Sequence, residues 1–586
     1  MLRNTKLNRI AIAVAMSMGM ATAAFAQETS SGISGKIVGP QGVPAAGTVI
    51  TITHVPSGST KTAVVNAAGQ FSAQGLRVGG PYSVKVDSDK FQDTVVEGVY
   101  LTLGESLPLD LSLETEQNIE RIAVTASQIS SIEFGKIGPG STFNLEDLDA
   151  APSVDRDIKD IVRIDPRISI SEDNGEESII CGGSHPRFSS LTVDGVRMND
   201  SFGLNNNGYP TVRMPFSFDA IDQVAVEIAP FDVQYGGFTG CNINAVTKSG
   251  TNEVHGSTFF DYSSDSLSGD SVDGDKVERG DYTTKRYGFN VGFPLIADTL
   301  FGFVSYEKLE GAQIFTYDAL TNGSVTMDEV NRAIQIAKDV YGYDAGGMPA
   351  SAPVEDEKLL VKLDWNINDS HRASLVYNYN DGFVIDQSDE NSGTLTLSNH
   401  YYKKGATLDA VVASLYSDWT ENFSTEVRVG KTKLDNEQRS TDAASGFGEV
   451  QISSLENGGQ IFLGPDDSRQ SNDLNWENTT VKIAGTYYLD DHTITGGYEL
   501  ESLDVFNLFM QHTIGEYRFG GDFRRNTQGG ASGLDDFEAG IADDVYYNNS
   551  AGTNIPDDAA ANFSYSTQAV YLQDEWVMDD VTLMFG

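Results

Sequence analysis

The sequence predicts an all-β-dominated protein in three parts: an N-terminal β-sandwich, a small α+β domain and a transmembrane antiparallel β-barrel. Residues 32–113 hold six or seven short alternating strands separated by Gly, Pro and Asn turns, which is typical of a β-sandwich. From residue 254 the alternating strands become longer, and short polar turns such as 420–422 alternate with long loops. Aromatic side chains lie near the strand ends: Tyr287, Trp365, Trp419, Trp476 and Trp576. Together these features indicate an outer-membrane β-barrel.

Residues 1–26 have the three parts of a secretory signal peptide. Basic residues come first, an apolar stretch follows at 10–16, and Ala24-Phe25-Ala26 supplies the A-x-A cleavage pattern. We expect cleavage after Ala26. No later stretch approaches the ~20 apolar residues of a membrane-spanning helix, so the sequence predicts an exported protein that is not an α-helical membrane protein.

The charge balance excludes one class of partner. The 586 residues include 84 acidic and 39 basic side chains, which gives a net charge of -45. Nucleic-acid binding needs a basic surface, so we expect no nucleic-acid partner. The negative charge suits a surface that holds divalent cations or meets cationic ligands, or acidic loops that are simply solvated. No Ser-His-Asp arrangement, phosphate loop or metal-ligand cluster stands out in the sequence, and we expect neither an enzyme nor a cofactor.

The chain has two cysteines, Cys181 and Cys241. In an oxidising compartment an even pair favours a disulfide. It would close a loop of about 60 residues, worth roughly 4 kcal/mol in the chain-entropy model. Cys181 and His185 also have a metal-ligand spacing, but no second pair lies nearby, so we expect no metal site there.

The stretch 221–252 carries the most specific pattern. An alternating run breaks at a proline, a glycine-studded turn follows, and a second alternating run ends in Thr-Lys. It resembles the end of the plug domain in TonB-dependent outer-membrane receptors. The residues that carry the match are Pro230, Tyr235, Gly236, Gly240, Ile243, Asn244, Val246, Thr247 and Lys248. The resemblance implies a plug at 137–250 inside a barrel that begins at 251.

A second plug pattern lies at 187–197, where Arg187 opens a segment that ends in the tight-turn signal Asp194-Gly195. Neighbouring motifs look most like the Oar-like branch of the family. Two positions depart from the family: it often has an arginine before the Gly-Pro that follows this strand, where this chain reads Glu227-Ile228-Ala229-Pro230, and Cys241 replaces a glycine. The usual arginine–glutamate contacts between plug and barrel are therefore not carried over. Helical spacing at 153–163 predicts a plug helix capped by its first serine.

The N-terminal unit resembles carboxypeptidase regulatory-like domains, which are immunoglobulin-like modules without catalytic residues of their own. His54 stands alone there and predicts an ordinary surface histidine. The linker at 114–136 contains a segment that looks like a TonB box, which pairs with the partner TonB by edge-strand addition. An ordinary linker strand is the alternative. The box residues are Ile122, Ala123, Val124, Thr125 and Ala126.

The resemblance implies a receptor that binds a ligand at the cell surface and imports it with energy from the TonB complex. The alternative is an adhesion or structural protein anchored in outer-membrane lipid by the same barrel. The ligand stays open between a peptide, an oligosaccharide and an iron chelate. We count about eleven barrel strands at 251–586, whereas the family closes its barrel with twenty-two, so we expect a fragment. A loop at 326–342 has amphipathic helical spacing and predicts either a lid or a packed loop helix.

Overall fold

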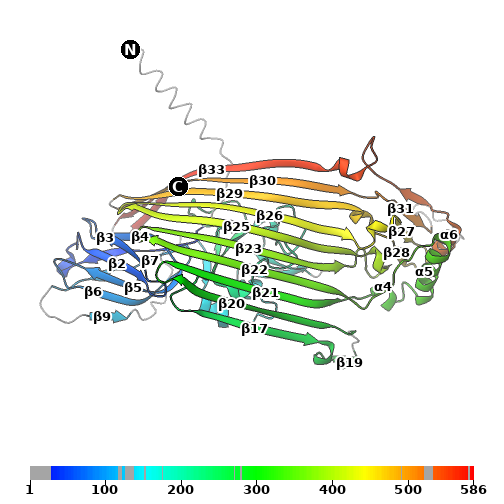
Figure 1. Ribbon diagram of the computed structural model, residues 1–586, viewed down its shortest axis with the longest axis horizontal. Helices are drawn as coiled ribbons and strands as arrows, with labels where there is room; N and C mark the ends of the chain where they lie inside the picture. Colours follow the sequence, from blue (N-terminus) through cyan, green and yellow to red (C-terminus); the bar gives the residue numbers. More distant parts are fainter. Residues whose placement is uncertain are drawn as a thin grey trace, which may run out of the picture.

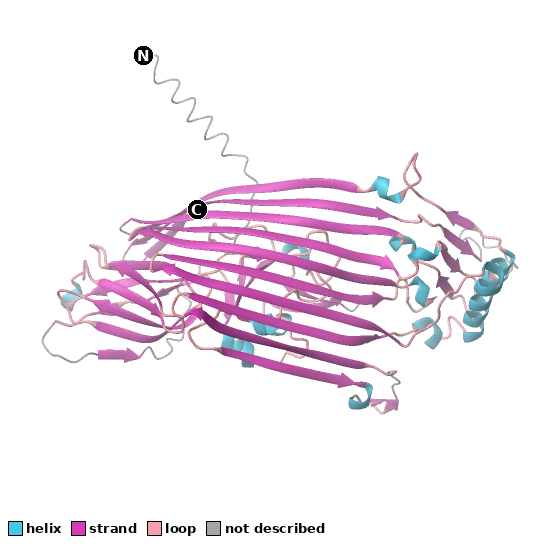
Figure 2. Cartoon of the chain, viewed as in Figure 1, coloured by secondary structure: helices cyan, strands magenta, loops and turns pink. Residues whose placement is uncertain are grey.

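The computed structural model describes residues 28–115, 122–125, 138–150, 153–173, 176–269, 271–276, 280–489, 491–520, 532–578 and 581–586. Strands dominate it, with a β-sandwich at one end of a large antiparallel sheet and a cap of loops and short helices at the other (Figure 1, Figure 2). The predicted all-β-dominated fold is therefore confirmed. Within the described ranges, no helix has the length and apolar character that a membrane crossing requires.

The N-terminal sandwich consists of two facing sheets. One contains β1 (Ser31–Val38), β4 (Gln70–Leu76), β7 (Ser106–Pro108) and β8 (Leu111–Ser112). The other contains β3 (Ser59–Val64), β2 (Val49–His54), β5 (Gly79–Asp87), β6 (Thr94–Leu101) and β9 (Ile122–Thr125), in that order. Alternate residues of β1 to β6 enter a common apolar core, as the fully buried Ile33 and Ile50 illustrate.

His54 is buried, so the prediction of a surface histidine was wrong. Its Nδ1 atom lies 2.7 Å from the Ser57 hydroxyl, and its ring packs against Tyr82 with centroids 4.9 Å apart. Burial, followed by the nearby Arg77 and Arg372 guanidinium groups, lowers the pKa of His54 to about 3. His54 is the last residue of β2, and the alternation of side chains along this strand places it on the inner face of the sandwich.

The central domain is a five-stranded sheet with short helices and one separate hairpin. The sheet order is β10 (Gly140–Phe143), β15 (Ile221–Ile228), β16 (Cys241–Thr247), β13 (Ser190–Val193) and β14 (Val196–Arg197). The hairpin is β11 (Ile168–Asp173) and β12 (Glu176–Cys181), and the helices are α2 (Leu145–Ala150) and α3 (Lys159–Val162). All seven residues of β16 are buried, because strands pack on both of its edges and the large sheet covers the domain.

The predicted helix at 153–163 is much shorter in the structure. Only Lys159–Val162 is helical, and Ser153 lies outside it, although its hydroxyl still accepts a hydrogen bond from the Asp157 N–H at 3.2 Å. Arg156 breaks the helix because it has a left-handed backbone, with φ of 53°. Its guanidinium stacks 3.6 Å from the Phe259 ring of the large sheet. This tertiary contact outweighs the helical preference of the sequence.

The large sheet has eleven antiparallel strands, each paired with its sequence neighbour in the sheet, as the sequence predicts. The strands are β17 (His255–Ser264), β20 (Thr283–Ile296), β21 (Leu300–Ile314), β22 (Ser351–Asn368), β23 (His371–Asp386), β25 (Tyr402–Thr420), β26 (Phe423–Ser440), β29 (Ser471–Leu489), β30 (His492–Met510), β33 (Ala561–Met578) and β34 (Val581–Phe585). Most of these strands extend further toward the long loops than the alternating apolar segments of the sequence predict.

The two faces of this sheet differ along their length. In β26, alternate residues from Arg428 to Ser440 are buried on the concave side. Near the short turns the outward residues are apolar, such as Val429, which is 47% exposed. Beyond Gly430 the outward positions are charged: Lys431, Lys433, Asp435, Glu437 and Arg439. The turn-proximal half therefore suits lipid, and the loop-proximal half suits water.

The long loops fold into a cap with its own apolar core (Figure 1). It contains a sheet of β24 (Thr394–Thr396), β28 (Gln460–Leu463), β27 (Glu449–Ile452), β31 (Glu516–Phe519) and β32 (Asp544–Tyr546). Its helices are α4 (Asp318–Thr321), α5 (Met327–Tyr341) and α6 (Gly533–Ala539), and a small hairpin, β18 (Ser271–Val272) and β19 (Asp275–Lys276), lies in a separate loop. The predicted helix at 326–342 is confirmed as α5, with a Thr326–Glu329 capping box and a left-handed Gly342 at its end.

Candidate functional site: the central domain against the barrel wall

The central domain lies against the concave face of the large sheet, and the two share one apolar cluster that includes Phe216 and Phe303. A few polar contacts surround this cluster and join the domain to individual strands. They are the contacts that any movement of the domain relative to the wall would break. We describe them before the residues that the sequence singled out.

A buried link joins the turn between β13 and β14 to strand β22. Asp194 accepts hydrogen bonds from the Thr247 hydroxyl at 2.6 Å and the Thr247 N–H at 3.1 Å. The Lys362 ammonium group donates to the Thr247 carbonyl oxygen at 2.8 Å and lies 3.4 Å from the Asp194 carboxylate. A cavity of about 510 Å³ adjoins all three residues. The ionic link is therefore close to open space, into which the domain has room to move.

Gly195, the next residue of the turn, lets the domain approach β26. Its φ of 78° is left-handed, and a Cβ atom at this position would overlap the Arg428 guanidinium. Arg428 pairs in turn with Glu426, whose other oxygen lies 2.9 Å from the Lys482 ammonium group. This charged row on the inner wall therefore faces the Asp194-Gly195 turn directly.

Glu28 and Thr29, which precede the first strand of the sandwich, lie between the central domain and the barrel wall. The buried Asn244 side chain accepts a hydrogen bond from Thr192 at 2.9 Å and donates to the Glu28 carbonyl oxygen at 2.5 Å. Arg428 donates to the Thr29 hydroxyl at 2.6 Å. The start of the described chain is thus anchored on both the central domain and the barrel.

The two cysteines form a disulfide, Cys181–Cys241, which joins the β11–β12 hairpin to the first residue of β16. Gly240 precedes it, and a Cβ atom there would lie 2.6 Å from the Ser189 hydroxyl and 3.1 Å from the Ser184 side chain. A residue without a side chain is needed because the chain turns closely past the 184–189 segment.

The remaining predicted plug residues do not join this cluster. Arg187 is exposed, and its guanidinium donates to the Gly203 carbonyl oxygen at 3.3 Å. Pro230 follows Ala229, which has a φ of 53°, at a turn outside the sheet. Tyr235 and Gly236 lie in the segment before β16, with the Tyr235 hydroxyl against Gly104 of the sandwich. The contacts of Arg187 and Tyr235 described here are with the central domain and the sandwich, not with the barrel wall.

Four residues of the predicted TonB box form β9, and Ala126 lies outside the described residues. Strand β9 pairs in parallel with β6, with Thr94 opposite Ile122 and Glu97 opposite Thr125. It is an edge strand of the sandwich sheet, so one side of its backbone has no strand partner among the described residues. Gly140, the first residue of the central sheet, follows Thr125 by 15 positions.

Sequence reasoning missed the wall residues that contact the central domain, which are Glu307, Lys362, Arg428, Lys482 and Glu501, and it missed Glu426, which pairs with two of them. Each of them is a charged residue within a long alternating strand, at a position on the concave face. Charged residues in register with the inward positions of a barrel strand are the signal that could have found them. Their partners could not be identified without the fold.

Comparisons with known proteins agree with this architecture. Residues 246–333 and 337–586 match the model of the outer membrane beta barrel domain family, and residues 32–114 match the carboxypeptidase regulatory-like domain. The first match covers more than half of the chain. The chain therefore belongs to the outer membrane beta barrel domain family, and its location is the outer membrane.

The relatives are TonB-dependent transporters and receptors. The chain is 25% identical over 398 residues to the TonB-dependent transporter Oar of Myxococcus xanthus, with 64% of this chain and 35% of the relative covered. It is 25% identical over 319 residues to the probable TonB-dependent siderophore receptor PirA of Acinetobacter baumannii, with 52% and 36% covered. The chain thus spans about a third of the length of these relatives.

Among solved structures, the outer membrane transporter YddB from Escherichia coli superimposes with a TM-score of 0.51 at 13% identity. The superposition covers 76% of this chain and 55% of that one. At this identity the likeness supports the fold: a sheet of barrel strands with a domain on its inner face.

Proposed function

We propose that the chain is the receptor portion of a TonB-dependent outer-membrane transporter. The cap and the upper surface of the central domain bind a ligand, and the central domain acts as the plug. Energy from TonB, applied through 122–126, shifts the plug relative to the barrel wall and opens a path for import. The observation that carries this proposal is the position of the domain on the inner face of the barrel sheet, held by a few discrete polar links.

Those polar links surround the shared apolar cluster and can be broken one at a time. Arg197 lies 3.5 Å from Glu501, and the Ser217 hydroxyl donates to Glu307 at 2.8 Å. Each link can be replaced by water when the two surfaces separate, so the cost of movement is divided among steps. A porin needs an open lumen, whereas here a domain packs against the inner face of the described barrel strands.

The position of β9 supports 122–126 as the point where force is applied. Edge-strand addition needs an extended backbone with one unpaired side, and β9 has that geometry. Pulling on β9 would first separate it from β6 and then load the short connection to β10. The carboxypeptidase regulatory-like domain would in this way hold the box in place until TonB engages it.

The test is a pull-down of the mature full-length protein with the periplasmic domain of TonB. Three forms are compared: the unaltered protein, a deletion of Ile122–Ala126, and Val124→Pro, which removes one backbone donor and keeps the length. A deletion of residues 116–120 is the control for linker length. We expect both box variants to lose TonB binding and ligand uptake, while ligand binding at the cell surface and the control stay unchanged. An adhesion or structural protein would behave identically in all four forms.

A further inference from the structure

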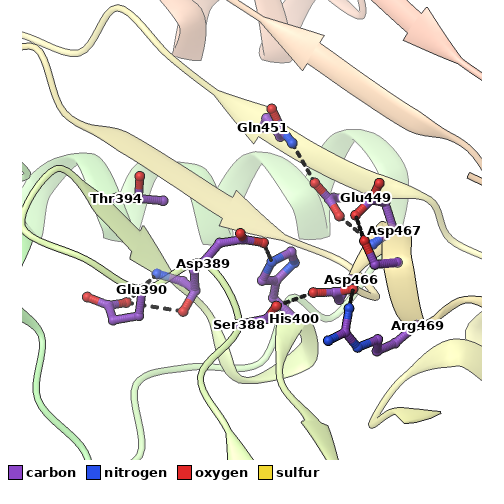
Figure 3. Close-up of polar contacts among 12 residues, drawn as sticks. Ser388, Asp389, Glu390, Thr394, His400, Glu449, Gln451, Asp466, Asp467 and Arg469 are labelled. Carbon is purple, nitrogen blue, oxygen red and sulfur yellow. Dashed lines mark hydrogen bonds and ion pairs between the residues drawn. The ribbon is translucent and has the colours of Figure 1, made fainter. Parts of the chain in front are cut away.

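The cap contains two groups of metal-ligating side chains. Figure 3 shows the first group together with Asp467 of the second. The first is Asp389, His400 and Asp466, and the second is Asp467, His512 and Glu516. Within each group the candidate ligand atoms lie within 4.8 Å of one another. The adjacent residues Asp466 and Asp467 belong to different groups, so one short segment contributes to both.

In the first group the surroundings of His400 fix the role of each ring nitrogen. His400 is fully buried, and its Nδ1 atom lies 3.0 Å from the Gly464 carbonyl oxygen, which can only accept a hydrogen bond. The Nε2 atom therefore faces the Asp389 carboxylate, 3.1 Å away. This nitrogen can hold a proton and donate it to Asp389, or it can give its lone pair to a metal ion that takes the place of the proton. Metal-ligating histidines commonly donate their second N–H group to a backbone carbonyl in this way.

Asp466 adds an unsatisfied acceptor to the same group. The residue is 2% exposed, its Oδ2 atom accepts a hydrogen bond from Ser388, and its Oδ1 atom has no hydrogen-bond partner. The Arg469 guanidinium lies 4.0 Å from this oxygen, beyond hydrogen-bond distance. A buried carboxylate oxygen without a donor is costly, and a bound cation would satisfy it.

The second group has a similar arrangement around His512. Its Nδ1 atom lies 2.9 Å from a Glu516 oxygen and 3.1 Å from an Asp467 oxygen, yet it forms no hydrogen bond of acceptable geometry with either. Glu516 is 1% exposed, and its other oxygen pairs with Arg518. Two carboxylates on either side of one ring nitrogen form a converging nitrogen and oxygen donor set.

We propose that the cap binds two divalent transition-metal cations, one at Asp389–His400–Asp466 and one at Asp467–His512–Glu516. One histidine with two carboxylates is a mixed donor set that suits Zn²⁺ and similar ions, whereas Ca²⁺ prefers oxygen donors alone. Ligands of a tetrahedral Zn²⁺ lie roughly 3.4 Å apart. The histidine–carboxylate pairs at 2.9–3.1 Å would therefore widen slightly on binding, and any pair nearer the 4.8 Å limit would close. Asp389, with a side chain 49% exposed, gives the ion a route into the first site.

The two ions would join three separate loops of the cap. Asp389 and His400 lie between β23 and β25, and Asp466 and Asp467 lie between β28 and β29. His512 follows β30, and Glu516 is the first residue of β31. The first ion connects the first loop to the second, and the second ion connects the second loop to the third. The metals would therefore fix the shape of the surface that meets the ligand.

A proton is the competing occupant of the first site. Burial opposes the charged form of His400, but the hydrogen bond to Asp389 and the surrounding carboxylates raise its pKa to about 9. A transition metal must displace this proton, whereas a site built only for the imidazolium will not bind metal. Direct measurement of metal content separates the two possibilities.

The test uses metal-depleted full-length protein in detergent, titrated with Zn²⁺ alone and followed by calorimetry and elemental analysis. We expect two equivalents bound by the unaltered protein, one by His400→Gln or His512→Gln, and none by the double variant. His255→Gln, at the exposed opposite end of the sheet, is the matched control and should retain two equivalents. Zn²⁺ should also slow amide exchange in 387–393 and 511–515.

Zinc-edge X-ray absorption on the unaltered protein keeps the proposal testable even where a variant fails to fold. It should show nitrogen and oxygen ligands with an imidazole contribution. Stoichiometric binding that survives in the double variant would overturn the proposal, as would binding lost equally in the His255 control. Binding of Ca²⁺ but not Zn²⁺ would overturn the metal class.

Discussion

Replacing Lys362 by methionine should loosen the central domain from the barrel wall. The ammonium group donates to the Thr247 carbonyl oxygen at 2.8 Å and lies 3.2 Å from the Thr247 hydroxyl and 3.4 Å from Asp194. Removing one partner of a buried ion pair costs ~3–5 kcal/mol, because the other charge is left unpaired. Asp194 keeps its two hydrogen bonds from Thr247, which places the cost near the lower limit, at about 3 kcal/mol.

The assay is native-state hydrogen exchange of the β16 amides in the intact protein. A loss of about 3 kcal/mol raises the population of the opened state roughly a hundredfold, and the protection of Thr247 should fall by that factor. Lys403→Met is the matched control. Lys403 pairs with Glu437 at 2.7 Å on the outer surface, with both side chains more than a third exposed, so we expect a change below about 1 kcal/mol.

A double-mutant cycle isolates the ionic part of the effect. Asp194→Asn keeps a hydrogen-bond acceptor and removes the charge, so Lys362→Met should cost at least about 1 kcal/mol less in that background. Equal costs in both backgrounds would show that the ion pair contributes nothing. A Lys362→Met effect no larger than the Lys403 control would refute the assignment of this link as an anchor.

Three further changes have calculable outcomes. Gly195→Ala should lower the free energy of unfolding by more than the ~1–2 kcal/mol of a left-handed alanine, because the new Cβ atom also overlaps the Arg428 guanidinium. Gly182 is also left-handed but has open space around it, so Gly182→Ala should cost only the backbone part. Thermal melts of the two variants measure the difference. Replacing Cys181 and Cys241 together by serine should lower plug stability by ~4 kcal/mol in the chain-entropy model, and unchanged exchange of the β11–β12 amides would contradict this. His54 is neutral when folded, with a pKa of about 3, and titrates near 6.5 when unfolded, so sandwich stability should fall by about 2 kcal/mol from pH 7 to pH 5. His54→Gln should remove that dependence in exchange measurements on β2.

Local patterns predicted the parts of this fold that depend on near neighbours. The alternation of apolar residues located all eleven strands, because membrane strands must present lipid and lumen faces in turn. The helix in the cap was predictable because Thr326 and Glu329 form a capping box and Gly342 ends the helix. The Asp194-Gly195 turn was predictable for the same reason: its chemistry is local.

Contacts between distant segments were not predictable. Asp194 and Lys362 are 168 positions apart, and nothing in either segment identifies the other as its partner. The helix expected at 153–163 failed because Arg156 adopts a left-handed backbone to reach a barrel phenylalanine. The metal-ligating groups of the cap were also missed, because each assembles from two loops that are far apart in the sequence.

The length of the barrel strands determines how far the cap stands from the lipid. Strands β25, β29 and β30 have 19 residues each, whereas a tilted strand needs ~9–11 to cross the hydrocarbon layer. The excess of about eight to ten residues, at ~3.3 Å each and a tilt of ~45°, raises the cap by roughly 20 Å. Molecules too bulky to reach the bilayer surface, including antibodies and folded proteins, can therefore touch this cap without displacing the surrounding lipid.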